Sequence, residues 1–406
     1  MCSEDRLKNK KLVITSIVFN LSLLFSFKYL SFSWNTLVHP LGETLGMTLP
    51  ILEKSLPPVG ISFFTFQTMS YAMDVYRGNL NASKSFLNFA VYVSMFPQLV
   101  AGPIVRAKDL LPQIAEKAGM KWNMIGEGGQ LFLRGFIKKV CIADTFAVMI
   151  VDAGFRQPEL FSPEWRVLIM LAYSFQIYFD FSGYSDMAIG IGKVMGFEFP
   201  KNFDHPYRSA SFSEFWTRWH ISLSSWLKDY LYIPLGGNKK STLRTYFNLM
   251  LTMTLGGLWH GASWMFVLWG VLHGLALILQ RLASSLFKGV RVPKLFSVVL
   301  VFSLTTLFWV PFRSDNLDHV LMFWMSPFEI SLEGVWSEIS RLNWNLKLLF
   351  SIAVGSHFLL AFCPANFHLK WLPFPIKVVL WSTLLFWMLH FYPEGQNVQP
   401  FIYFQF

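Results

Sequence analysis

Two histidines, His220 and His260, are the side chains whose setting in this sequence favours chemistry. Each follows a tryptophan, in the pairs Trp219-His220 and Trp259-His260. Imidazole has an ordinary pKa of about 6.5, so it can accept and return a proton near neutral pH. His260 ends the apolar run 246–259, and an ionisable residue at membrane depth is costly enough to indicate function. The alternative for both is structural, because a histidine can also cap a helix or bind a neighbouring carbonyl.

The stretch around His220 is predicted to be an amphipathic helix that lies at the membrane interface or re-enters the membrane. It belongs to the segment 199–274, on which we expect any catalysis to centre. His220 lies at the edge of one apolar stripe with helical spacing, formed by Phe212, Phe215, Trp216, Trp219, Leu223, Trp226 and Tyr230. Pro234 and the pair Gly236-Gly237 interrupt the segment, so it is a poor spanning helix.

The composition indicates a polytopic all-α membrane protein. Hydrophobic residues make up 53% of the 406 residues and charged residues only 14%, whereas soluble domains carry about 25% charged residues. No linker-like stretch divides the chain, so we expect one integral domain over residues 1–406. The three cysteines show no paired spacing, which argues against a disulfide framework or a cysteine metal motif.

The basic residues lie mostly between the apolar runs and give a net charge of +10. Such loop charge sets membrane topology and meets anionic lipid headgroups. We expect no nucleic-acid partner, because a basic groove needs a soluble surface that this chain lacks. The first eleven residues are polar and basic and no cleavage site follows, which predicts a cytoplasmic N-terminus without a signal peptide.

About ten spanning or re-entrant helices are expected. Outside the central segment we predict them at 12–30, 58–76, 86–100, 131–151, 166–179, 264–279, 295–312, 346–362 and 376–391. Residues 37–56 contain Pro40 and Pro50, so we predict that they form a connector or a tilted half-helix. Lys28, near the end of the first run, is expected to snorkel towards the interface.

Two aspartates, Asp180 and Asp186, lie near the end of one apolar run. They invite an acid/base interpretation, but we favour helix capping or pairing with Arg208 or Lys193. Ser182-Gly183 offers a break, after which a new helix would begin.

Two long strings carry a family resemblance: FSEFWTRWHISLSSWLKDYLYIPLGGNK and GGLWHGASWMFVLWGVLHG. Together they closely resemble the membrane-bound O-acyltransferase family, and within it the bacterial alginate O-acetyltransferase branch. The strings MFPQLVAGPIVR and YFDFSGYSDMAIGIGKVMGF and the ending FIYFQF are also similar to that family. The resemblance implies helices around a central channel in the bacterial inner membrane. Relatives usually carry one or two more spanning segments before residue 12.

The resemblance also implies roles for the two histidines. His260 would be the base that takes the hydroxyl proton, and His220 would orient the acceptor or polarise the carbonyl. Trp219 and Trp259 are the flanking candidates for substrate contacts. Gly257 and Gly261 would leave room for a thin thioester chain. Acyl transfer needs such a base, stabilisation of an oxyanion and a dry path.

Two charged residues are candidates for the donor side. Arg106 has either a structural role at a capped helix end or a binding role in contact with an anionic donor. Asp229, near a basic loop, lies either at the mouth where an acyl carrier docks or on a solvated surface. Serines near His220 suggest a serine nucleophile, which we discount because no third orienting group is visible in the sequence.

The sequence therefore predicts a membrane O-acyltransferase with no bound cofactor and no metal. The acetyl donor would be acetyl-CoA or an acyl carrier protein thioester. The acceptor would be a surface polysaccharide or exopolysaccharide, reached directly or through a periplasmic acetyltransferase partner. One alternative is D-alanyl transfer to teichoic acid, although PLGGNK and FIYFQF favour the alginate-like branch. The other is a polysaccharide or lipid transporter without catalysis, which helix number and basic loops fit equally well.

Overall fold

The computed structural model describes residues 3–359 except 100, 101, 117, 118, 120 and 291, together with isolated residues between 373 and 401. The described part is helical and contains no strand. Within these described residues, three helices are long and apolar enough to cross a membrane: Asn9–Thr44, Trp264–Leu286 and Lys294–Arg313. The predicted helix 376–391 and the ending FIYFQF fall largely outside the described residues.

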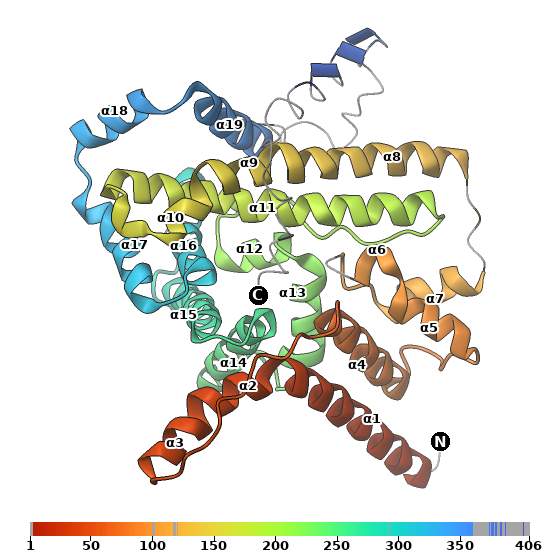
Figure 1. Ribbon diagram of the computed structural model, residues 1–406. Coiled ribbons are helices and arrows are strands. Elements are labelled where there is room, and N and C mark those ends of the chain that lie inside the picture. Colours follow the sequence, from red (N-terminus) through yellow and green to blue (C-terminus); the bar gives the residue numbers. More distant parts are fainter. Residues whose placement is uncertain are drawn as a thin grey trace.

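An N-terminal arm runs along one edge of the molecule (Figure 1). It consists of α1 (Ser3–Leu24), a π-helical turn at Phe25–Tyr29, α2 (Leu30–Ser33), a second π-helical turn at Trp34–Val38 and α3 (His39–Thr44). The expected connector at 37–56 is therefore helical in its first part, and only residues from 45 onward leave the helix. The arm packs on α4 (Ile61–Arg77).

Helix α11 (Pro163–Val194), 32 residues long, lies beside α8 (Trp122–Phe136) (Figure 1). The predicted break at Ser182-Gly183 is wrong, because α11 continues through it. Gly183 serves close packing instead: a Cβ atom there would lie 2.7 Å from the carbonyl oxygen of Gly135 on α8. Glycine permits this approach because it has no side chain.

The segment around His220 is two short helices. They are α12 (Phe212–Arg218) and α13 (Ile221–Leu227), followed by a π-helical turn at Lys228–Tyr232. The single amphipathic helix that we predicted is wrong at this point, although most of its apolar stripe is buried. The break arises because the Ile221 N–H donates to the Asn202 carbonyl at 2.9 Å and the Asp204 N–H to the Arg218 carbonyl at 2.9 Å. Tertiary contacts thus replace helical hydrogen bonds.

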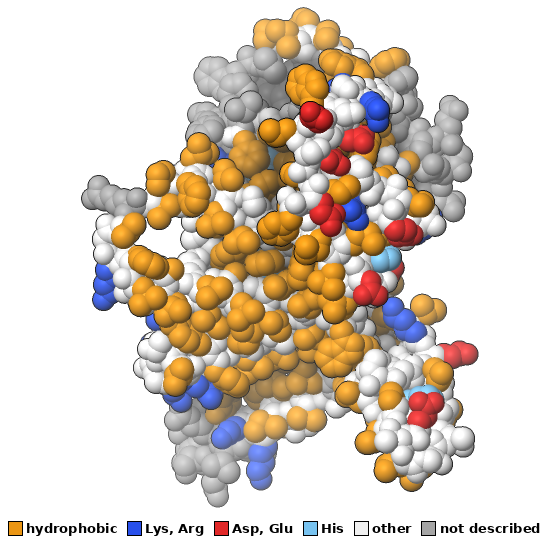
Figure 2. Space-filling model, turned by 90° about the vertical axis from the view of Figure 1, so that its left-hand side faces the viewer, with side chains coloured by type: hydrophobic (Ala, Val, Ile, Leu, Met, Phe, Trp, Pro, Cys, Tyr) orange, Lys and Arg blue, Asp and Glu red, His pale blue; other side chains and the backbone are white. Residues whose placement is uncertain are grey.

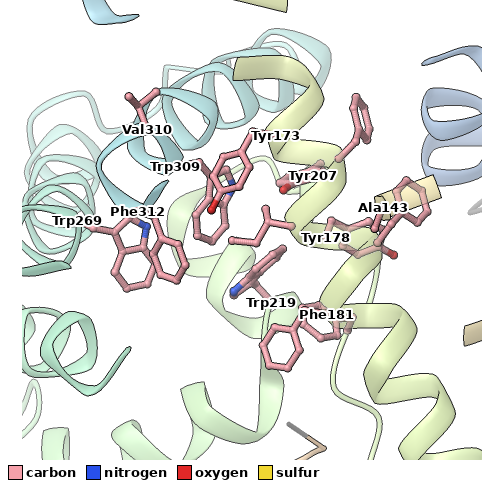
Figure 3. Packing of buried hydrophobic residues seen from close by; sticks show 14 of the residues in the cluster. Ala143, Tyr173, Tyr178, Phe181, Tyr207, Trp219, Trp269, Trp309, Val310 and Phe312 are labelled. Atoms are coloured by element: carbon pink, nitrogen blue, oxygen red, sulfur yellow. The ribbon is translucent and has the colours of Figure 1, made fainter. Parts of the chain in front are cut away.

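Three long helices follow: α14 (Thr242–His260), α15 (Trp264–Leu286) and α16 (Lys294–Arg313). Trp219, Trp269 and Trp309, from the α12–α13 junction, α15 and α16, meet in the core (Figure 3). The ring centroid of Trp309 lies 4.8 Å from that of Trp219 and 5.7 Å from that of Trp269. This aromatic core holds the α12–α13 junction against the helices that follow it.

Side chains on one outer face of the molecule are largely hydrophobic (Figure 2). Exposed apolar residues include Leu279 and Leu286 on α15 and Leu295 and Phe296 on α16, as expected of a surface that faces lipid. The other helices are α5 (Phe86–Ser94), α6 (Phe96–Leu99), α7 (Ala107–Ala115), α9 (Asp144–Phe146), α10 (Asp152–Arg156), α17 (Leu317–Glu329), α18 (Leu332–Arg341) and α19 (Trp344–Val354).

Candidate active site

His220 is the N-cap residue of α13 and is fully buried, with 0% of its surface exposed. Its backbone is left-handed, with φ 41° and ψ 56°. A residue with a Cβ atom rarely adopts this conformation, and such strain gathers at functional sites. The ring packs edge-on against Phe181, with centroids 4.6 Å apart. His220 is therefore fixed in both backbone and ring.

Asn202 determines which nitrogen of His220 carries the proton. The Asn202 Oδ1 atom accepts from the Ser222 N–H at 3.2 Å and from the Ser222 hydroxyl at 2.8 Å. The same oxygen lies 3.2 Å from the His220 Nδ1 atom. A backbone N–H can only donate, so the Asn202 Oδ1 atom that it contacts is an acceptor. The His220 Nδ1 atom must therefore carry a proton and donate to that oxygen. The neutral ring then carries its lone pair on Nε2, which is buried and has no hydrogen-bond partner among the described residues.

This geometry argues against a serine nucleophile. The Ser222 hydroxyl lies 3.5 Å from the His220 Nδ1 atom, but that nitrogen already carries the proton of the neutral imidazole and cannot accept the hydroxyl proton. The hydroxyl also accepts from the Ile104 N–H at 2.9 Å, which ties α13 to the segment before α7. Ser222 acts here as part of the scaffold that holds Asn202 and His220.

His260 is the last residue of α14 and is 5% exposed. Its ring lies among aromatic rings from three helices: Trp259 on α14, Trp269 on α15 and Phe312 on α16, each with its centroid 5.1 Å away. All three contacts are edge-to-face, at 78°, 88° and 72°, a favourable arrangement of aromatic groups. His260 is therefore held in a buried aromatic setting.

Trp259 connects the two histidines. Its ring centroid lies 6.1 Å from that of His220 and 5.1 Å from that of His260, so residues 40 positions apart (260 minus 220) meet at one side chain. Trp219, by contrast, is 2% exposed and packs in the core against Trp309. Of the two tryptophans expected to contact substrate, Trp259 is the one that contacts both candidate catalytic groups.

The two glycines beside His260 serve helix packing in this structure. A Cβ atom on Gly257 would lie 2.2 Å from the Phe266 carbonyl oxygen, and one on Gly261 would lie 2.2 Å from the Phe266 ring. Both glycines face α15, so the expectation that they leave room for a thioester chain is not met.

Arg106 and Asp229, far apart in sequence, form an ion pair with Nη2 and Oδ2 2.9 Å apart. They line a cavity of ≈ 500 Å³ that also contains Arg77, Lys108 and Tyr230. The Arg106 and Arg77 guanidinium groups lie 4.7 and 5.3 Å from the centre of the Tyr230 ring. Burial works against the charge of Arg106, but Tyr230 and Asp229 outweigh it and raise the pKa of the guanidinium. With three basic residues against the carboxylates of Asp229 and Asp74, the lining carries a net positive charge.

A stack of aromatic rings joins this cavity to the histidines. Tyr230 contacts Trp226 at 5.2 Å, Trp226 stacks on Phe66 at 3.7 Å with planes 5° apart, and Phe66 lies 5.3 Å from Trp259. The Trp226 indole N–H donates to the Phe66 carbonyl at 3.0 Å. The cavity and the histidines thus lie at the two ends of one buried aromatic column.

The two aspartates on α11 form ion pairs, but their partners differ from those predicted. Asp186 pairs with Arg134 and Lys138, at 3.0 and 2.8 Å, and Asp180 pairs with Lys139 at 2.5 Å. All three cations come from α8 or the turn after it, because α8 packs along α11. The structural interpretation is supported, and the partners proposed for them, Arg208 and Lys193, are wrong.

Sequence reasoning missed Asn202 and Phe66. Asn202 precedes His220 by 18 positions, and no helical or strand spacing links them. Phe66 is one phenylalanine in an apolar helix and gives no separate signal. Among the described residues, no group of three or more His, Cys, Asp or Glu side chains is arranged to hold a metal ion.

The family model for the membrane-bound O-acyltransferase family matches residues 79–310, which is more than half of the chain. The chain belongs to the membrane-bound O-acyltransferase family. The predicted resemblance is thereby confirmed, and with it the class of the fold: a helical membrane protein. The matched range contains His220, His260, Asn202 and the ion pair of Arg106 and Asp229.

Relatives within this family include a protein named probable alginate O-acetylase AlgI from Pseudomonas aeruginosa. It is 45% identical over 82% of this chain and 62% of its own length. A peptidoglycan O-acetyltransferase from Helicobacter pylori is 40% identical over 76% of this chain and 63% of its own. A teichoic acid D-alanyltransferase from Streptococcus thermophilus is 29% identical over 55% of this chain and 56% of its own. The chain spans less than two thirds of the length of these relatives.

Proposed function

We propose that this protein is a membrane O-acetyltransferase that moves an acetyl group from a thioester to a hydroxyl of a cell-surface polysaccharide or exopolysaccharide. The observation that carries the proposal is that His220 and His260 both contact Trp259, and that the buried His220 Nε2 lone pair has no hydrogen-bond partner in the part of the chain that the structure describes. The greater identity to O-acetyltransferases than to the D-alanyltransferase supports acetyl as the group.

In this proposal His260 is the general base. It takes the proton of the acceptor hydroxyl while the oxygen attacks the thioester carbonyl carbon. The carbon–sulfur bond then breaks, and the imidazolium returns its proton to the leaving thiolate. The attacking hydroxyl has one proton, which goes to His260. Because Nε2 of His220 can only accept, His220 would orient the acceptor by receiving a hydrogen bond from another hydroxyl of the sugar. Polarisation of the carbonyl, the other role considered for His220, would need a proton on that nitrogen.

The cavity around Arg106 is the proposed binding site for the donor. Coenzyme A and the arm of an acyl carrier protein both carry phosphate, which guanidinium groups bind well. Asp229 holds Arg106 in place in the absence of donor and would be displaced from it or share it. A thioester arm that follows the aromatic column towards the histidines has to move Phe66 or Trp226 aside, since these rings are stacked in contact.

The arrangement of charge supports donor access from the cytoplasm. α1 and α4 run antiparallel, because Asn20 bonds Thr68 and Lys28 bonds Ser62. The basic start of α1 therefore lies at the same end as Arg77 in the cavity. Basic residues favour the cytoplasmic side, so this end would face the cytoplasm.

We further propose that residues 1–406 form one integral domain of the bacterial inner membrane, with about ten spanning or re-entrant helices around a central channel. The exposed apolar face would contact membrane lipids (Figure 2). The acceptor is reached from the opposite end, either directly or through a periplasmic acetyltransferase partner. The donor is acetyl-CoA or an acyl carrier protein thioester, and the proposal needs no bound cofactor.

The decisive experiment measures acetyl esters on the surface polysaccharide of cells that express wild type, His260→Ala or His220→Ala at matched membrane levels. Loss of esters in the His260 variant, by at least about 100-fold as is typical for removal of a general base, supports the proposal. His39→Ala on α3, remote from the site, is the matched control and should retain esters.

Two results would favour the alternatives. Release of D-alanine in place of acetate from the same ester fraction would indicate D-alanyl transfer to teichoic acid. Normal esters in a double variant of His220 and His260 that inserts normally would favour a transporter or scaffold, because such a protein contributes no base.

A further inference from the structure

The C-terminal end of α14, where His260 lies, is not closed by its own backbone turn. The last four carbonyl groups of any helix have no partner within the helix. Many helices close this end with a left-handed residue whose N–H folds back. Here the following residue, Gly261, is extended, with φ −164° and ψ 155°. The carbonyl groups beside the candidate base must therefore find other donors.

Lys28 and Tyr29, on the first π-helical turn of the N-terminal arm, provide those donors. The Lys28 ammonium donates to the carbonyl oxygens of Trp259 at 2.6 Å and His260 at 2.8 Å. The Tyr29 hydroxyl donates to the Leu258 carbonyl at 2.6 Å. Three successive carbonyl groups at this helix end are thus bound by two neighbouring residues that lie 229 to 232 positions away.

The expected snorkelling of Lys28 is therefore wrong: its ammonium turns inward to the end of α14. A cation at a helix C-terminus meets the negative end of the helix dipole, which is where a positive charge is most favourable. Hydrogen bonds from an ammonium to carbonyl groups are also stronger than neutral ones. π-helical turns occur often at functional sites, and this one presents both capping residues to the same helix end.

We propose that Lys28 is a positioning residue for catalysis: it fixes the backbone of His260 so that the imidazole keeps its place in the aromatic site. The rings of Trp269 and Phe312 restrain the side chain from one direction. The ammonium restrains the main chain on both sides of His260, through the carbonyl groups of Trp259 and His260. Lys28 precedes the family-matched residues 79–310, so the N-terminal arm adds a part of the site that the family match does not cover.

The inference rests on the proposed role of His260 as the base. If His260 moved by about 1 Å relative to the thioester, the rate would fall by about 100-fold while substrate binding stayed intact. Loss of Lys28 should therefore lower the maximal rate and leave the Michaelis constant for the donor unchanged. A lysine that only held the arm to the bundle would lower the amount of folded protein instead.

The test uses membrane vesicles that contain the full chain, with [¹⁴C]acetyl-CoA as donor and alkali-labile label in polysaccharide as the readout. We compare wild type, His260→Ala, Lys28→Met and Lys28→Arg, with Lys11→Met, an exposed lysine of α1, as the matched control. We expect Lys28→Met to lose about 100-fold in maximal rate at unchanged Michaelis constant and membrane level. Lys28→Arg keeps a cation with several donors and should recover at least tenfold of that loss.

A second variant separates positioning from folding. Lys28→Ala leaves space at the helix end, and added ethylammonium should restore part of its rate, whereas ethanol, which lacks the charge, should not. Rescue by both compounds or by neither contradicts a positioning cation. If Lys28→Met keeps a maximal rate within twofold of wild type while His260→Ala is inactive, the inference about Lys28 is overturned and the proposed base stands. Activity in His260→Ala overturns both the inference and the proposed base.

Discussion

The Nδ1 atom of His220 lies 3.2 Å from the Oδ1 atom of Asn202, and this contact fixes the tautomer of the histidine. Ser222 holds the asparagine oxygen from the other side with both its N–H and its hydroxyl. The Asn202 amide nitrogen donates to the Ser185 hydroxyl at 3.1 Å on α11. An asparagine thus orients the histidine, and its own orientation is set by donors on α13 and an acceptor on α11.

Replacing Asn202 with alanine should reduce acetyl transfer without removing the protein from the membrane. The His220 ring would then be free to carry its proton on either nitrogen, and the fraction with an Nε2 lone pair would fall. We expect a 10- to 100-fold lower rate, in the range seen when a residue that orients a catalytic group is lost. Maximal rate and membrane level are measured together. An unchanged rate would show that the tautomer of His220 does not matter.

Arg106→Gln should weaken donor binding more than it slows the chemical step. The substitution removes a guanidinium whose charge the cavity keeps at all physiological pH values, and a hydrogen bond to a charged group contributes about 1.5–3 kcal/mol. That range corresponds to a rise of about 10- to 150-fold in the Michaelis constant for the donor. Lys288→Gln, an exposed basic residue outside the cavity, is the control. Equal effects of the two substitutions would indicate general surface charge rather than a donor site.

Gly257→Ala should destabilise the protein, whereas Gly256→Ala, one residue earlier in the same helix, should be tolerated. A Cβ atom at Gly257 would lie 2.2 Å from the backbone oxygen of Phe266, which cannot move without shifting α15. At Gly256 the contact is 3.1 Å from the end of the Leu227 side chain, which can rotate. Overpacking costs about 1–3 kcal/mol, so the midpoint of thermal unfolding in detergent should fall for Gly257→Ala alone. Similar midpoints for the two variants would contradict the packing seen here.

Asp180→Asn should lower stability but leave the specific activity of the folded protein intact. Asp180 pairs with Lys139 in the interior between α11 and the turn after α8, with only 3% of the carboxylate side chain exposed. Removal of one partner from a buried pair costs about 3–5 kcal/mol, and the second pair of Lys139, with Asp144 at 2.6 Å, reduces this loss. Activity per folded molecule is the readout that decides. A large fall in it at normal stability would revive the acid/base role for this residue.

The apolar runs, the basic loops and the two Trp-His pairs could be recognised from the sequence, because membrane insertion and helix formation depend on local composition and spacing. The first helix, the buried stripe of residues 212–230 and the family followed from them. The helix boundaries around His220 could not be predicted in this way. Residues 202–204 form hydrogen bonds with the backbone of this segment, whereas local spacing predicts that those groups bond within one continuous helix.

The tertiary structure alone decided which distant residues serve the two histidines. Asn202 reaches His220 from 18 positions away, and Lys28 reaches the backbone of His260 from 232 positions away. The partners of Asp186 likewise come from α8, which meets α11 only through helix packing. Residue spacing describes neighbours within one helix, whereas these contacts depend on how separate helices pack. The sequence therefore determined the helical membrane class and the histidines, and the fold determined what orients them.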